Sequence, residues 1–152
     1  MRPEEELRFL ILGAQREGSR VMSARLAPIG LTPAQAEVIR CLADTGPISL
    51  RALGERLVCE SGSPSRLVDS MVGRELVVRR ENPEDRRQVT LELTAAGRAL
   101  DSEVRKVEEE LYAGISAQLG KDGIAAALRL IQPLLEGSAS GAAIARRKAK
   151  SR

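Results

Sequence analysis

The chain has 152 residues, of which 43% are hydrophobic, enough for one domain with a sizeable core that needs no disulfide or metal to fold. It contains no histidine, and its two cysteines, Cys41 and Cys59, have no metal-like spacing. The missing histidine excludes Ser/His and Cys/His catalytic pairs, and no glycine-rich phosphate loop is present. We therefore expect no metal, no cofactor and no enzymatic activity.

The net charge of +3 is unevenly distributed. Residues 137–152 carry +5 and no acid, so residues 1–136 carry +3 − 5 = −2. Nucleic-acid binding therefore has to be argued from local arginine clusters. No apolar run approaches the roughly 20 residues that span a bilayer, and Glu4, Glu5 and Glu6 stand where a signal peptide has positive charge. We expect a cytoplasmic protein with no membrane partner.

The sequence predicts three helices between residues 3 and 58. Residues 3–26 have apolar side chains at helical spacing, and Pro28 and Gly30 end that segment. Thr32-Pro33-Ala34-Gln35 is a capping box and predicts a helix from Pro33 to about Asp44. Ser49 is a suitable N-cap for a short helix from Leu50 to about Val58.

A turn then leads to a helix with one apolar and one polar face. Ser63 would be its N-cap and Pro64 its first residue, and the helix is expected to run to about Arg74. Its buried side is predicted to hold Leu67, Val68, Met71 and Val72. Its outward side would hold Ser65, Arg66, Asp69 and Ser70. Such a polar face suits contact with a DNA groove.

Two β-rich runs, Leu76 to Val78 and Val89 to Leu93, flank a polar segment with Asn82-Pro83 and Asp85-Arg86-Arg87. This pattern predicts a long hairpin with a cationic tip. The arginines that cluster on and around it are Arg79, Arg80, Arg86 and Arg87. A helix followed by a basic β-ribbon is the winged helix-turn-helix arrangement, and the ribbon is suited to touching phosphates.

After the hairpin, Thr94 is predicted to cap a long helix that ends at Gly120, and a last helix spans about Asp122 to Leu135 with an interruption near Pro133. Both carry a single apolar stripe, as does the segment 3–26. Burial of these stripes by a partner chain predicts a homodimer. Residues 137–152 are small and basic, and we expect them to be disordered.

From Leu31 to Gly97 the chain resembles the multiple antibiotic resistance regulator (MarR) family. The resemblance rests on Asp85-x-Arg87 followed by Leu93-Thr94 and Ala96-Gly97, and on Arg66-Leu67-Val68-Asp69 followed by Leu76-Val77. It implies a mainly α fold with a small β-wing: an N-terminal dimerisation helix (1–30), a winged helix-turn-helix domain (31–97), C-terminal dimerisation helices (98–136) and the basic tail (137–152). It also implies a dimeric transcription factor, usually a repressor released by a small effector, on a pseudo-palindromic operator in double-stranded DNA.

The resemblance also implies residue roles. Arg87 would enter the minor groove from the wing tip, Arg86 would contact phosphate, and Asp85 would pair with an arginine and hold the wing loop in shape. The other expected DNA contacts lie at and after the start of the polar helix: Ser61, Ser63, Ser65, Arg66 and Ser70. For Ser63, capping alone is an equal alternative.

The sequence departs from the family pattern at Glu75, where many members have glycine, so the left-handed turn there is either strained or supplied otherwise. Pro64 lies two positions after the usual proline site at Gly62, which leaves the register of base contacts open. Cys59 is best explained as a small core residue, with a redox-responsive regulator as the alternative. A winged helix that binds protein is a further alternative. The effector-binding residues cannot be assigned from the sequence.

Overall fold

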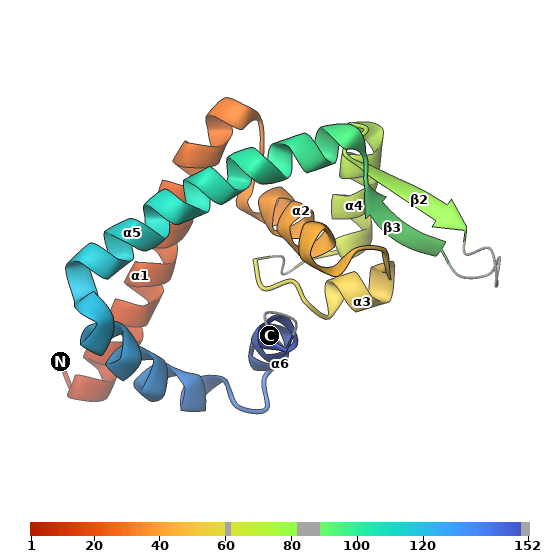
Figure 1. Ribbon diagram of the computed structural model, residues 1–152. Coiled ribbons are helices and arrows are strands. Elements are labelled where there is room, and N and C mark those ends of the chain that lie inside the picture. Colours follow the sequence, from red (N-terminus) through yellow and green to blue (C-terminus); the bar gives the residue numbers. More distant parts are fainter. Residues whose placement is uncertain (60–61, 82–88, 150–152) are drawn as a thin grey trace.

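The chain folds into helices around a small sheet, and the computed structural model describes residues 1–59, 62–81 and 89–149 (Figure 1). In chain order the elements are α1 (Pro3–Leu26), η1 (Ala27–Ile29), α2 (Pro33–Thr45), β1 (Ile48–Ser49), α3 (Leu50–Gly54), α4 (Pro64–Gly73), β2 (Val77–Glu81), β3 (Val89–Leu93), α5 (Ala95–Ile131), η2 (Gln132–Leu135) and α6 (Ala139–Lys148). The mainly α fold with a small β-wing that the sequence predicts is confirmed.

Local sequence sets where the helices begin. The Thr32 hydroxyl accepts from the Gln35 amide at 3.3 Å, and the Gln35 side chain accepts from the Thr32 amide at 3.0 Å, which is the predicted capping box. Ser49 caps α3 by accepting from the Ala52 amide at 3.2 Å. Helix α3 ends at Gly54, earlier than the predicted Val58. The amides of Arg56 and Leu57 bond to the carbonyls of Leu53 and Gly54, three residues back, so the chain leaves α3 through tight turns instead of continuing the α-helix.

The core joins all parts of the winged unit, which comprises α2, α3, α4 and the sheet. The sheet order is β1-β3-β2, with both pairings antiparallel. Ile39 of α2, Leu53 of α3, Met71 of α4, Leu91 of β3 and Val104 of α5 are all almost completely buried in one cluster. The start of α5 therefore belongs to the core of the winged unit, and the rest of α5 extends away from it beside α1 (Figure 1).

The C-terminal third contains one confirmed prediction and one correction. Gly120 has φ 63° and ψ 175°, so it breaks the long α5 where the sequence predicts a helix end. The expected disordered tail is wrong for residues 139–148, which form α6. The Ser138 hydroxyl caps that helix by accepting from the Gly141 amide at 3.0 Å, and alanine favours a helix. Contacts of α6 with the winged unit add to this local preference.

Among the described residues, no helix combines the length and the apolar character needed to cross a bilayer.

Candidate nucleic-acid interface

Helix α4 presents the polar face that the sequence predicts. Val68 and Met71 are fully buried, whereas Arg66, Asp69 and Ser70 are exposed and Ser65 is half-buried. Pro64 is the first helical residue. Ser63 occupies the N-cap position, but its hydroxyl makes no capping bond to α4, so capping does not account for that serine.

Helix α4 is tied to the base of the wing by an ion pair. Arg79 of β2 donates to the exposed carboxylate of Asp69 at 2.5 Å. The next residue, Arg80, pairs with Glu92 of β3 at 3.0 Å. Two of the arginines predicted to surround the hairpin, Arg79 and Arg80, are thus paired with carboxylates. Through its pair with Arg79, Asp69 connects the polar face of α4 to the base of the wing.

Strands β2 and β3 pair in register out to Glu81 opposite Val89, and so direct the hairpin away from the core (Figure 1). The predicted wing-tip residues Asp85, Arg86 and Arg87 lie outside the described residues, as does Ser61 before α4. Of the predicted contacts, the structure brings Ser63, Ser65, Arg66 and Ser70 together on α4.

The exit from α4 contains the strained turn that the sequence left open. Glu75 has φ 57°, in the left-handed region that favours glycine. The Leu76 amide bonds to the Met71 carbonyl at 3.0 Å, and the Thr94 hydroxyl donates to the Glu75 carbonyl at 2.6 Å. These bonds close the turn although Glu75, unlike glycine, carries a side chain in the left-handed region. Arg74 additionally donates to the capping-box side chain of Gln35 at 3.2 Å, which fixes α4 on α2.

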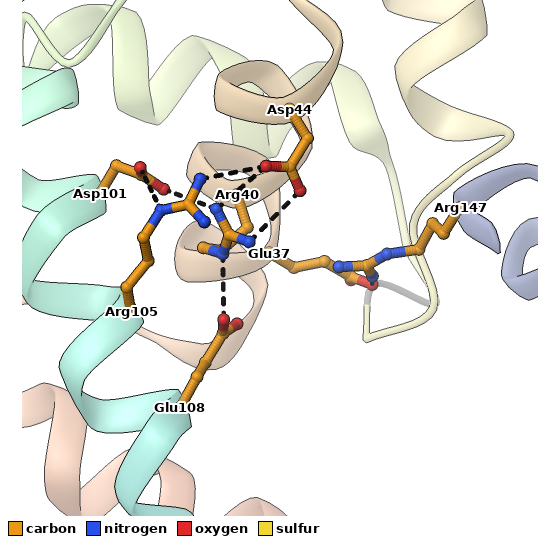
Figure 2. A network of polar contacts seen from close by, with 7 residues as sticks. All are labelled: Glu37, Arg40, Asp44, Asp101, Arg105, Glu108 and Arg147. Atoms are coloured by element: carbon orange, nitrogen blue, oxygen red, sulfur yellow. Dashed lines mark hydrogen bonds and ion pairs between the residues drawn. The ribbon is translucent and has the colours of Figure 1, made fainter. Parts of the chain in front are cut away.

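Glu37 anchors the segment that leads to α4. Its carboxylate is almost buried, and it accepts from the backbone amides of Val58 at 2.9 Å and Cys59 at 2.7 Å. These bonds hold the chain after α3 in a non-helical path. A third donor, Arg147 of α6, reaches the same carboxylate at 2.5 Å (Figure 2).

The two cysteines have different environments. Cys41 is buried, as predicted, whereas Cys59 is exposed, so its assignment to the core is wrong. The cause is the Glu37 anchor, which pins the Cys59 backbone amide at the surface of α2. Partial desolvation and then the neighbouring Glu37 carboxylate raise the pKa of the Cys59 thiol to about 11. The thiol therefore stays protonated at neutral pH, which disfavours oxidation.

A polar network joins the winged unit to α5 (Figure 2). Arg40 of α2 is 13% exposed and pairs with Asp101 and Glu108 of α5, each at 2.9 Å, and with Asp44 at 3.2 Å. Arg105 bridges Asp101 and Asp44 at 2.8 and 3.1 Å. Burial opposes the charge of Arg40, but the carboxylate bonds outweigh it and raise its pKa.

Arg40, Asp44 and Arg105 of this network line one wall of an open cleft of about 1020 Å³ between α2, α5 and α6. Tyr112 of α5 and Cys59 lie on its walls, and Ile144, Arg146 and Arg147 of α6 form the opposite side. The cleft thus lies between the winged unit and the long helices.

Sequence reasoning missed Glu37, Arg40 and Arg74 as residues that position the reading head. For Glu37 and Arg40 the available signal was a charge within the apolar pattern of α2, since a charged residue on a buried face requires a partner. Arg74 is exposed and carried no such signal. The partners of these residues are far away in the chain, and for Arg74 and Gln35 the separation is 39 residues.

The fold and the exposed polar helix beside a β-hairpin define a winged helix-turn-helix protein. The model of the MarR family matches residues 31–89. The multiple antibiotic resistance protein MarR of Escherichia coli K12 is 29% identical over 130 residues, covering 83% of this chain and 88% of that protein. The chain is similar to the MarR family over residues 31–89 and has the winged helix-turn-helix DNA-binding fold of these transcriptional regulators.

Solved structures agree with this assignment. A mutant of E. coli MarR complexed with operator DNA is 27% identical, with a TM-score of 0.77 over 86% of this chain and 94% of that chain. The transcriptional repressor CouR bound to a 23-mer DNA duplex is 27% identical, with a TM-score of 0.76 over 88% of this chain and 94% of that one. The proteins matched in sequence are regulators rather than enzymes.

Proposed function

We propose that this protein is a sequence-specific regulator of transcription that binds double-stranded DNA as a homodimer. The observation that carries the proposal is the exposed polar face of α4, held at a fixed angle to the wing by the Asp69–Arg79 pair. A helix of this kind fits the major groove, and an adjacent basic wing reaches the neighbouring groove or backbone. Two relatives of the same fold were solved with DNA.

Exposed apolar side chains support the homodimer. On α1, Leu7 and Leu10 are 52% and 63% exposed, and on the outer part of α5, Ile115 and Leu119 are 42% and 51% exposed. These residues belong to the stripes that the sequence predicts to be buried. A second copy of the chain would cover them. Its two-fold axis would set two recognition helices one DNA turn, roughly 34 Å, apart on a pseudo-palindromic operator.

The residue roles that we propose rest on the family resemblance and on the chemistry of each side chain. Arg66 would contact a guanine edge or a phosphate, and the hydroxyls at the start of α4 would contact phosphates: Ser61, Ser63, Ser65 and, one turn on, Ser70. At the wing tip, Arg87 would enter the minor groove, Arg86 would bind phosphate and Asp85 would hold the loop in shape.

Repression and release by a small molecule in the cytoplasm complete the proposal. The small molecule would bind in the cleft beside Tyr112. Movement of the winged unit against α5 at this cleft would change the separation of the two winged units in the dimer. Cys59 gives little support to the redox-responsive alternative, because its raised pKa keeps it in the less reactive thiol form.

The test of the wing is Arg87→Ala, measured on a duplex selected from the source genome by binding to the wild-type protein. We expect the affinity to fall by a factor of about 10 to 100, the usual size of one lost arginine contact, with the dimer unchanged in sedimentation. Arg16→Ala removes the same charge from an exposed position on α1 and should bind like wild type. Equal affinity of Arg87→Ala and wild type would show that the wing does not contact DNA.

A binding curve that barely depends on salt would instead favour the protein-binding alternative. Several phosphate contacts release counterions and produce a steep fall of affinity with salt, whereas a protein interface depends on salt weakly.

A further inference from the structure

Helix α6 lies against the winged unit and contacts it through two arginines. Arg147 donates to Glu37 of α2 at 2.5 Å. Arg146 donates to the Glu55 backbone carbonyl at 3.3 Å and lies 3.7 Å from the Glu55 carboxylate. Glu55 directly follows α3, so both arginines contact the helix-turn-helix part of the winged unit. Figure 1 shows α6 beside this part of the fold.

The Glu37–Arg147 contact differs from an ordinary surface ion pair. The Glu37 side chain is only 5% exposed, whereas that of Arg147 is 39% exposed. Two backbone amides, those of Val58 and Cys59, also donate to this carboxylate. A buried carboxylate that loses its cationic partner keeps an uncompensated charge, which is far more costly than the loss of an exposed pair.

We propose that α6 is a latch on the recognition helix: Arg147 neutralises Glu37, and Glu37 in turn holds the backbone of Val58 and Cys59, which precede α4 in the chain. Glu37 and Arg147 are positioning residues, because they act on DNA through α4. The consequence for DNA binding rests on the proposed function, whereas the effect on the 58–59 segment does not. An ordered segment before α4 lowers the ordering cost of DNA binding, so the latched form binds more tightly.

Hydrogen exchange of the DNA-free, full-length protein tests the latch itself. In Arg147→Gln the amides of Val58 and Cys59 should exchange about tenfold faster or more, because local opening becomes easier. Arg147→Lys keeps the charge and should restore most of the protection. Lys148→Gln removes one charge from the next residue of α6 and is the matched control, with expected protection within about twofold of wild type. Unchanged protection in Arg147→Gln would overturn the proposal.

DNA affinity tests the coupling to α4. On the selected duplex, Arg147→Gln should bind about three to ten times more weakly than Lys148→Gln, although both variants have lost one positive charge. Equal affinities of these two variants would overturn the coupling, because charge loss alone would then explain the effect. If the wild-type protein bound no duplex at all, the proposed function would fail, and the exchange rates would still decide whether α6 latches the segment.

Discussion

Glu75 has a left-handed backbone at the end of the recognition helix, with φ 57°. A side chain in this conformation costs roughly 1–2 kcal/mol, and glycine avoids that cost but loses about 0.5–1 kcal/mol through its freer unfolded chain. The bonds from Leu76 and Thr94 do not depend on the Glu75 side chain. Glycine therefore fits this turn better than glutamate.

We predict that Glu75→Gly raises the free energy of unfolding by about 0.5–1 kcal/mol, measured by urea denaturation. The control is Glu109→Gly at an exposed position inside α5, where the same exchange should lower it by about 1 kcal/mol. A destabilised Glu75→Gly protein would mean that the turn is not strained by its side chain.

Several single residues were predictable because their reasons are local. Thr32 and Gln35 form the capping box that four consecutive letters indicate, and Thr94 caps α5 by accepting from the Gly97 amide at 3.1 Å. Cys59 was not predictable, because its exposure depends on Glu37, 22 residues earlier in the chain. Contacts between neighbouring residues can be predicted from the sequence, whereas the distant partner of a buried carboxylate cannot.

At the level of elements, the junction between the wing and α5 depends on one glycine. A Cβ on Gly97 would lie 2.2 Å from the Leu76 carbonyl oxygen and 3.1 Å from a Leu93 methyl group. Both neighbours are buried, and the Leu76 carbonyl also accepts from the Thr94 amide at 3.1 Å. The base of the hairpin therefore packs directly on the first turn of α5.

We predict that Gly97→Ala lowers the free energy of unfolding by about 1–3 kcal/mol, because the backbone of the wing base has to move. Gly114→Ala is the matched control in the same helix, where the added methyl meets nothing within 4 Å and should stabilise by about 0.5–1 kcal/mol. Thermal denaturation of both variants measures the difference. Equal shifts in the two variants would show that the wing base can move at no cost.

The elements that were predicted well are those with strong periodicity and clear end signals, such as α2 and β3. Helix α6 was missed because its composition is small and basic, and its position depends on the contact between Arg147 and Glu37, which are 110 residues apart. Helix α3 was predicted too long. The amides of Arg56 and Leu57 already bond three residues back in tight turns, and the distant Glu37 carboxylate then takes the amide of Val58, where the helix was predicted to end.

For the whole molecule, the structure shows a winged unit joined to α5 by a shared core and by the Arg40 network. The apolar residues on α1 and the outer α5 are exposed and would be covered by the second copy in the proposed homodimer. A rigid junction between each winged unit and its α5 would fix the spacing of the two winged units on DNA. The central claim is therefore that two copies bind one duplex, largely by charge.

Titration of a fluorescent duplex, selected from the source genome, with the intact protein at a series of salt concentrations tests this claim most directly. We predict two chains per duplex and an affinity that falls by about a thousandfold or more between about 50 and 200 mM salt, as expected for six or more phosphate contacts across the dimer. A protein that stays monomeric and leaves the duplex unbound even at the lowest salt concentration would contradict the account.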